Sequence, residues 1–305
     1  MKVDSLEPAE PNTTAASDAP PPDWSHSSPE GNRRWEAWKQ LDQPDPDTKV
    51  KPAELRRVRL YGGAQGIWVD RAETVSDEFV EGITVSVLHT DSDYPDEFSE
   101  GGARYHYPVT KRHRGRDAAE VEATKNCRRA SLPLLAITRP TPSSTFRSCR
   151  WAWVEDWNDT LQEFYLSFEI QPPGSDTLFD PTDARKSRRR LAKVRPGQSR
   201  FRFLVEKRYG AECAVCGIDI RSMLQAAHIV AKEFKGTDDP RNGLMLCANH
   251  HLAFDAKLFS IDPDTWKINP CPSMTFTTLE ISRKTLRHLQ KKPAPEALEL
   301  RNASD

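Results

Sequence analysis

Short apolar runs broken by Gly, Pro and Asp fill the chain from about Leu55 to Ile170, a spacing typical of β-strands. One helix is expected among them, at Arg116–Ala130, because basic residues gather at its C-terminal end as the helix dipole favours. Five or six strands with one crossing helix predict a compact α+β domain that can form a barrel. The expected strands are Gly66–Val69, Ile83–His89, Ala103–Pro108, Leu132–Thr138, Cys149–Trp157 and Glu163–Ile170.

A second pattern predicts a β-hairpin followed by a helix. Leu224–Val230 alternates as a strand that places His228 on one face and Gln225 on the other. After a polar loop, Gly243–Leu246 predicts the returning strand, and a helix is expected from near Cys247.

The expected helix carries different residues on its two sides. His251 and Asp255 lie four residues apart and therefore project from one side. Leu252, Phe254 and Leu258 are expected to face the core. Three polar residues of the hairpin and the helix can then converge, namely His228, Asn242 and His251.

The remaining segments carry weaker signals. Residues 1–52 are rich in Pro, Ser, Asp, Glu and Thr, which predicts a disordered tail. Within it, Arg33–Leu41 predicts an amphipathic helix that either docks on the body of the protein or binds a partner. Helices are also expected at Phe201–Tyr209 and Leu279–Lys291, and a strand or hairpin at Leu258–Asn269. We expect a tail at 1–52, a β-rich domain at 53–171, a basic linker at 172–199, a further domain at 200–292 and a second tail at 293–305.

The linker is acidic and rich in turns in its first half and strongly basic in its second half. This density of positive charge favours binding to the DNA backbone without reading its sequence. The alternative is a tract that only keeps the chain soluble. The cations expected to contact DNA are Arg188, Arg189, Arg190, Lys193 and Arg195.

Composition favours a soluble, cytoplasmic protein. The 305 residues include 29% charged residues, carry a formal net charge of −1 and have a mean hydropathy of −0.71. No apolar run is long enough for a membrane span and no basic-then-apolar leader follows Met1, so neither membrane insertion nor secretion is expected. A net charge near zero does not exclude DNA as a partner, because the local distribution of charge decides binding.

Four residues have the spacing of a metal site. Cys213 and Cys216 are two residues apart, and Cys247 and His250 repeat that spacing, so two tight turns can present four ligands to one tetrahedral zinc ion. A structural Zn²⁺ would then supply much of the folding free energy of this small segment. The alternative is four unrelated thiols and imidazoles. The other cysteines are expected to be reduced thiols, namely Cys127, Cys149 and Cys271.

The runs AAHI, RNGL and LCANHH followed by FD, between residues 226 and 255, resemble the HNH nuclease family, whose fold is the ββα-metal finger. The resemblance implies a metal-dependent DNA endonuclease in which His228 is the general base. It also implies that Asn242 fixes the loop and orients that base. His251 would bind the catalytic divalent metal, Mg²⁺ or Mn²⁺, and the adjacent His250 would be the fourth zinc ligand. These roles suit the chemistry of imidazole, which titrates near physiological pH and can accept a proton from water.

The chain departs from the family at Ala227, where many members carry an acidic residue or a histidine as a second metal ligand. Asp255 is the candidate replacement, and Gln225 is a poorer one because an amide is a weaker ligand than a carboxylate. Asp255 can alternatively cap the helix or pair with Lys257 or Arg241. The departure leaves open a catalytically weak or inactive HNH protein that only binds nucleic acid, and a repair or structure-specific nuclease is a third hypothesis.

In layout the chain resembles bacterial restriction-type HNH proteins that join an N-terminal DNA-reading domain to a C-terminal nuclease. In some of them the reader is a SET-and-RING-associated or similar PUA-like barrel that recognises modified cytosine. The run from GGAQGIW through YHYP and GRDAAE to ATKN is of the sort found ahead of this HNH type. The resemblance implies DNA as the partner and leaves homodimerisation open. Four aromatic residues near the basic run KRHRGR either stack on a base or fill the core, namely Trp68, Tyr94, Tyr105 and Tyr107.

Overall fold

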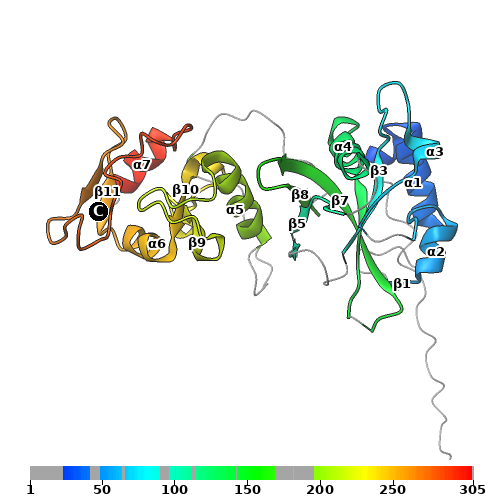
Figure 1. Cartoon of the computed structure of the whole chain (residues 1–305), viewed down its shortest axis with the longest axis horizontal. Coiled ribbons are helices and arrows are strands. Elements are labelled where there is room, and N and C mark those ends of the chain that lie inside the picture. Colours follow the sequence, from blue (N-terminus) through cyan, green and yellow to red (C-terminus); the bar gives the residue numbers. More distant parts are fainter. Residues whose placement is uncertain are drawn as a thin grey trace, which may run out of the picture. The chain divides into compact units, whose positions relative to one another are not determined.

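The computed structural model describes residues 23–41, 49–63, 66–89, 96–99, 101–110, 115–141, 143–168, 181 and 196–303. The chain divides into two compact units, each considered separately (Figure 1). Unit 1 comprises Met1–Pro95 and Tyr107–Val154, and unit 2 comprises Asp96–His106 and Glu155–Asp305.

Unit 1 is built on a mixed β-sheet whose described strands follow the order β2, β3, β6, β7. The neighbours β3 and β6 are parallel, with the crossing helix α4 between them in the chain, and the other pairs are antiparallel. The predicted strands and helix are confirmed, and the linear strand order does not by itself show the expected barrel. The elements are β1 (Lys49–Val50), β2 (Gly66–Val69), β3 (Thr84–His89), α4 (Arg116–Arg129), β6 (Leu134–Thr138) and β7 (Arg147–Asn158).

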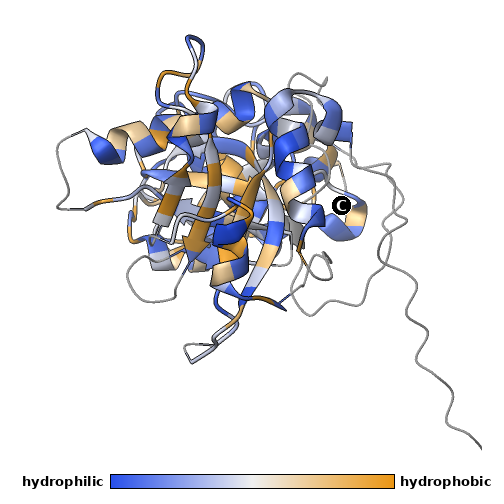
Figure 2. Ribbon diagram, turned by 90° about the vertical axis from the view of Figure 1, so that its right-hand side faces the viewer, coloured by the Kyte–Doolittle hydropathy of each residue, from blue (hydrophilic) through white to orange (hydrophobic). Residues whose placement is uncertain are grey.

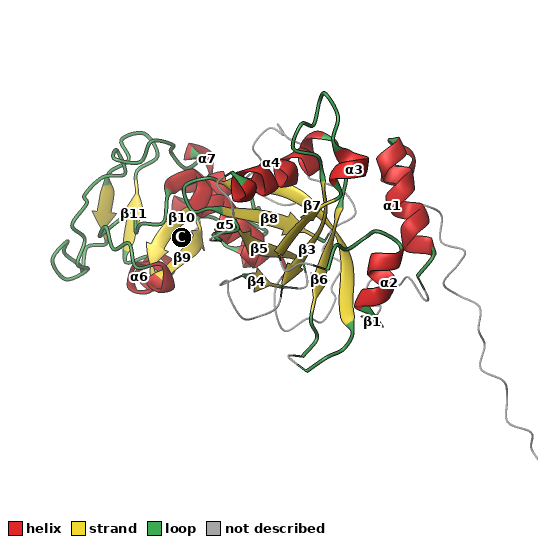
Figure 3. Ribbon diagram, turned by 45° about the vertical axis from the view of Figure 1, so that its right-hand side comes forward, coloured by secondary structure: helices red, strands yellow, loops and turns green. Residues whose placement is uncertain are grey.

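Helices cover both faces of this sheet (Figure 3). On one face, the Oγ1 atoms of Thr84 and Thr124 lie 2.9 Å apart and join β3 to α4. Val85 alternates to the other face, where it belongs to a core that includes residues of α1 and α2. Hydrophobic residues are concentrated on the strands, as expected for a sheet that helices cover (Figure 2). The covering elements are η1 (Asp23–His26), α1 (Pro29–Lys39), α2 (Pro52–Arg57) and α3 (Arg71–Thr74).

The helix expected at Arg33–Leu41 is α1, which begins earlier, at Pro29, because Ser28 caps it through a bond from the Gly31 amide. Of the two possibilities that the sequence left open, the structure shows docking. Trp38 is buried and its ring lies 5.4 Å from that of Trp151 on β7. The segment therefore contributes to the core of unit 1, unlike the tail expected for this part of the chain.

In unit 2, short strands pack against a long helix, α5 (Pro196–Tyr209). Phe203 of α5 lies 5.5 Å from the ring of Tyr165, while Phe201 belongs to the core of the segment that follows. Buried charges join the same elements, because Arg104 contacts both Glu163 and Glu206 at 2.5 Å. The strands are β4 (Glu97–Phe98), β5 (Gly102–His106), β8 (Glu163–Ser167) and the last residues of β7.

The expected hairpin and helix follow α5. They are β9 (Leu224–His228), β10 (Gly243–Cys247) and α6 (Ala248–Asp255), with three 3₁₀ turns at Arg221–Met223, Lys232–Phe234 and Pro240–Asn242. A second hairpin, β11 (Phe259–Ile261) with β12 (Ile268–Pro270), confirms the one expected within Leu258–Asn269. Phe254 faces the core as expected, but the prediction for Leu252 was wrong, since it is 70% exposed.

The C-terminal region differs from expectation. The helix predicted at Leu279–Lys291 does not form, because this segment bonds to other parts of unit 2, as in the bond from the Leu286 amide to the Trp266 carbonyl. A helix, α7 (Pro295–Asn302), instead occupies the segment expected to be a tail. Proline suits its first turn, and Ala297 and Leu298 are buried. Among the helices of the described part of the chain, none combines the length and apolar character needed to cross a bilayer.

Candidate functional site

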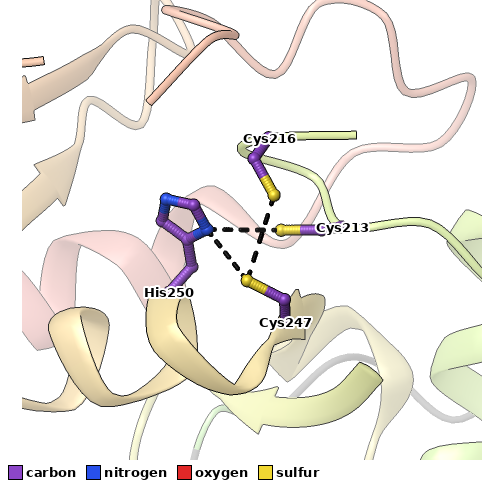
Figure 4. A group of neighbouring side chains, drawn as sticks. All are labelled: Cys213, Cys216, Cys247 and His250. Carbon is purple, nitrogen blue, oxygen red and sulfur yellow. Dashed lines mark hydrogen bonds between the residues drawn. The ribbon is translucent and has the colours of Figure 1, made fainter. Parts of the chain in front are cut away.

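Cys213, Cys216, Cys247 and His250 gather in unit 2 (Figure 4), with their ligand atoms all within 4.8 Å of one another. A tetrahedral zinc ion with metal–sulfur bonds of about 2.3 Å has ligand–ligand edges of about 3.8 Å. The Sγ atoms of Cys216 and Cys247 are 3.9 Å apart, and Cys213 Sγ is 3.7 Å from His250 Nδ1. The four residues therefore fit a metal ion of this kind.

The chain around the cluster is shaped to present these atoms. The Cys213 carbonyl accepts a bond from the Gly217 amide, and Gly217 adopts the left-handed conformation that closes this turn (φ +81°). His250 Nε2 donates to the Leu279 carbonyl at 2.9 Å, which leaves Nδ1 facing the sulfur atoms. The outer carbonyl thus selects the ring nitrogen that meets the metal.

The ionisable groups of the cluster shift one another's pKa values. Burial opposes ionisation of Cys213, but the hydrogen bond with His250 and bonds to backbone groups outweigh it and lower its pKa to about 6. Burial likewise acts to lower the pKa of His250, but Cys213 and Cys247 raise it to about 9. Cys213 is therefore held as a thiolate, the form of cysteine that binds metal, whereas burial raises the pKa of Cys216 to about 12.

His228, the predicted general base, ends β9 directly opposite Gly243 of β10. A Cβ atom at position 243 would lie 2.6 Å from Cγ2 of Val205 and 2.8 Å from Cζ of Phe201, so the glycine makes room for both side chains of α5. The Phe201 ring stacks on the imidazole of His228, with centroids 3.7 Å apart and planes inclined by 6°. Helix α5 and the hairpin together therefore set the plane of this imidazole.

Asn242 is completely buried at the end of the loop that joins the two strands. Its Oδ1 accepts a bond from the Val230 amide at 2.9 Å. Its Nδ2 donates to the carbonyls of Val230 at 3.1 Å and Thr237 at 2.9 Å. Asn242 thus connects both ends of the loop, the geometry that the expected role of fixing it requires.

Asp238 lies in this loop and was not singled out from the sequence. Its Oδ1 is 2.9 Å from His228 Nε2, and its Oδ2 is 2.8 Å from Lys232 Nζ. Burial acts to raise the pKa of Asp238, but the bonds to His228 and Lys232 prevail and hold it below its usual value. An ionised carboxylate therefore faces the predicted base.

His251 and Asp255 lie side by side on α6, as their spacing predicts. His251 Nδ1 is 2.7 Å from Gln225 Oε1, and its Nε2 is 3.4 Å from Asp255 Oδ2. Burial lowers the pKa of His251, whereas the negative charge of Asp255 raises it. Gln225 belongs to β9, the strand that ends at His228. The three predicted residues His228, Asn242 and His251 thus belong to one region of unit 2.

His251 and Asp255 are two donor groups of a kind that divalent cations accept. Gln225 accepts a bond at Nδ1, so Nε2 and the carboxylate of Asp255, which is 54% exposed, are left to face a metal ion. Ala227 is completely buried and offers no ligand, whereas the side-chain oxygen of Gln225 accepts a bond from His251. Asp255 pairs with His251, a contact that the sequence alternatives for this carboxylate did not include.

Arg301 of α7 connects the hairpin that carries His228 with the helix that carries His251. Its guanidinium donates to the carbonyls of Ile229 at the end of β9 and of Phe254 in α6, and lies 3.7 Å from the centroid of the Phe254 ring. The hairpin and the helix are therefore joined by a residue from a segment in which the sequence indicated only a tail.

Several other predicted residues do not join this region. The five linker cations lie outside the described residues, namely Arg188, Arg189, Arg190, Lys193 and Arg195. Two further basic residues are in α5, where Arg200 contacts Glu155 and Arg202 contacts Glu206. Tyr94 lies outside the described residues, whereas Tyr105 and Tyr107 are buried and Trp68 packs against Gly62.

Sequence reasoning missed Asp238 and Phe201. Asp238 had a weak signal, an acidic residue in the loop between the two strands, but the loop was interpreted only as polar. Phe201 had none, because its contact with His228 arises from the packing of α5 against the hairpin.

Comparison with known proteins concerns the same region. The model of the HNH endonuclease family matches residues 213–262. Among solved structures, the chain is similar to a "Modification dependent TagI restriction endonuclease" at 18% identity, with 85% of this chain and 92% of that chain covered and a TM-score of 0.34. At that TM-score a common fold is not demonstrated. No curated protein matches the chain.

Proposed function

We propose that the substrate of this protein is DNA. Residues 213–262 are an HNH endonuclease domain, and the protein is therefore a nuclease that hydrolyses phosphodiester bonds. We further propose a restriction-type nuclease whose N-terminal region reads a modified base. The first proposal is supported by the shared region of His228, Asn242 and His251, and the second by the sequence resemblance in layout.

The observation that carries the proposal is that two histidines of unit 2, His228 and His251, have different surroundings. His228 is held between a carboxylate and an aromatic ring, as suits a group that moves a proton. His251 stands beside an exposed carboxylate, as suits a metal ligand. Asn242 fixes the loop between them.

In the reaction, a water oxygen attacks the phosphorus and the bond from phosphorus to the 3′ oxygen breaks. His228 takes the proton that the attacking water loses, and the leaving oxygen acquires a proton from solvent. His251 and Asp255 would hold Mg²⁺ or Mn²⁺, which stabilises negative charge on the phosphate and the leaving oxygen. No covalent intermediate is needed.

The structural metal in this proposal is Zn²⁺. Cys213, Cys216, Cys247 and His250 would hold it between the turn before β9 and the start of α6. Cys247 ends β10 and His250 follows within the first turn of α6, so the metal would fix the direction in which the helix leaves the hairpin. That direction would place His251 beside Gln225 of β9.

The remaining parts of the proposal concern DNA binding. Residues 53–171 would be the reading domain, and the basic linker at 172–199 would contact the DNA backbone through Arg188, Arg189, Arg190, Lys193 and Arg195. The nuclease domain would begin at residue 200 and extend through α7 (Pro295–Asn302). A cytoplasmic location suits a restriction nuclease, and a homodimer would allow both strands to be cut.

The test is cleavage of plasmid DNA and of phage DNA with and without modified cytosine, in Mg²⁺ and in Mn²⁺. We expect metal-dependent nicking that His228→Ala abolishes while DNA binding persists. His288→Ala is the matched control, because His288 is exposed and lies outside the site. Cleavage by His228→Ala at the wild-type rate would refute the role of His228, and equal cleavage of all DNAs would refute the dependence on modification.

A further inference from the structure

We propose that Asp238 is a positioning residue that fixes the tautomer and the orientation of His228. The inference rests on the proposed function, in which His228 is the general base. It assigns a role to a loop residue that neither the sequence pattern nor the family resemblance identified.

The first step concerns the proton on the imidazole. An ionised carboxylate can only accept hydrogen bonds, so the contact of 2.9 Å between Asp238 and His228 Nε2 requires the hydrogen to lie on Nε2. In the neutral imidazole, Nδ1 then carries the lone pair. Nδ1 is therefore the atom that can accept a proton from water.

The second step concerns the ionisation of Asp238. Lys232 lies 2.8 Å from its other oxygen, and both contacts lower the pKa of the carboxyl group. The side chain of Asp238 is only 29% exposed, so water does not fully screen these contacts. Asp238 consequently remains an acceptor throughout the neutral pH range.

The third step concerns the plane of the ring. Phe201 stacks on the imidazole at 3.7 Å, which restricts tilting, while the bond to Asp238 restricts rotation within the plane. Turning the ring over would move Nε2 away from the carboxylate and break that bond. The two contacts therefore determine both the position and the direction of Nδ1.

The fourth step concerns the loop that carries Asp238. Asn242 donates to the carbonyl of Thr237, the residue immediately before Asp238, and also bonds to both backbone groups of Val230. The loop is thereby held at two places, one of which adjoins the carboxylate. Asn242 would orient the base through Asp238, because its side chain bonds to Val230 and Thr237, whereas the imidazole bonds to Asp238.

The test measures kcat, KM and the metal concentration for half-maximal cleavage in Asp238→Asn. An amide can present its NH₂ to Nε2 and so favour the wrong tautomer. We expect kcat to fall about 100-fold, the lower end of the range for general base catalysis, with KM and the metal requirement unchanged. Asp239→Asn is the matched control, because the neighbouring carboxylate contacts Arg241 instead and an asparagine can retain its capping bond.

Further variants separate the explanations. Lys232→Gln removes the other partner of Asp238 and is expected to keep most of kcat, while Asp238→Glu keeps the charge and is expected to recover part of it. Zinc content and thermal unfolding are measured for every variant. Should Asp238→Asn fail to fold, Asp238→Ala decides, since a lowered kcat at unchanged KM supports the inference and a wild-type kcat overturns it.

Two results would overturn the positioning role while the proposed function stands. One is wild-type kcat in Asp238→Asn when His228→Ala is inactive. The other is recovery of Asp238→Asn at high metal concentration, which would make Asp238 a metal ligand. Activity of His228→Ala would instead refute the proposed base itself, so the two failures are distinguishable.

Discussion

The loop between β9 and β10 depends on one buried side chain, and Asn242→Ala tests this dependence. The substitution removes three hydrogen bonds, with lengths of 2.9, 3.1 and 2.9 Å. It leaves the amide and carbonyl of Val230, which is only 4% exposed, and the carbonyl of Thr237 without these partners. Each buried group left in this way costs about 1–3 kcal/mol.

Thr237 is only half-buried, so its carbonyl can recover a bond from water, and we place the total loss in free energy of unfolding at about 3–5 kcal/mol. That loss is a large part of the about 5–15 kcal/mol that stabilises an ordinary domain. The opening of the loop should be visible before the rest of unit 2 unfolds, because the affected groups belong to residues 229–242.

The assay combines urea unfolding of the zinc-loaded protein with amide hydrogen exchange of peptides that cover residues 229–242. Asn269→Ala is the matched control, because Asn269 is exposed on β12 and its truncation should change stability by less than about 0.5 kcal/mol. A loss below about 1 kcal/mol for Asn242→Ala, with unchanged exchange in the loop, would refute the reasoning.

Three further predictions follow from other contacts. Cys216→Ser should lose the bound zinc and destabilise unit 2, while Cys271→Ser, outside the cluster, should retain both, as metal analysis and thermal unfolding would show. Gly243→Ala should displace Val205 and the ring of Phe201 at a cost of about 1–3 kcal/mol and lower kcat, and unchanged kcat would contradict the role of the stacked ring. Burial, against the opposing charge of nearby arginine, raises the pKa of Glu163 to about 7, above its usual 4.5, so the folded state retains a proton that the unfolded state releases. This proton contributes at most about 3 kcal/mol to the free energy of unfolding, and the contribution is present below pH 4.5 and lost as the pH rises through 7. The protein should therefore melt at a lower temperature at pH 8 than at pH 5.5, and Glu163→Gln should remove the part of that difference that Glu163 causes.

Local patterns in the sequence determined much of this protein. The alternation of Leu224–His228 and the turn spacing of the metal ligands depend only on near neighbours, and both are present in the structure as expected. The pairing of His251 with Asp255 likewise follows from helical spacing. Sites that depend on residues a few positions apart can therefore be predicted from the sequence alone.

Tertiary structure decided the features that join distant segments. Phe201 meets His228 because α5 packs on the hairpin, and Arg301 joins two elements from a segment whose composition indicated a tail. Leu279–Lys291 has helical periodicity, yet its amides bond to other segments of unit 2, and that pairing overrides the local preference.

The sequence by itself determined which chemical groups are present, namely a zinc-type ligand set and a histidine at the end of a strand. Only the tertiary structure decided which nitrogen of His228 carries the hydrogen, because that depends on where the loop places Asp238. The physical reason is that hydrogen bonds and ring stacking act over a few ångströms in space, whereas sequence spacing reports proximity only along the chain.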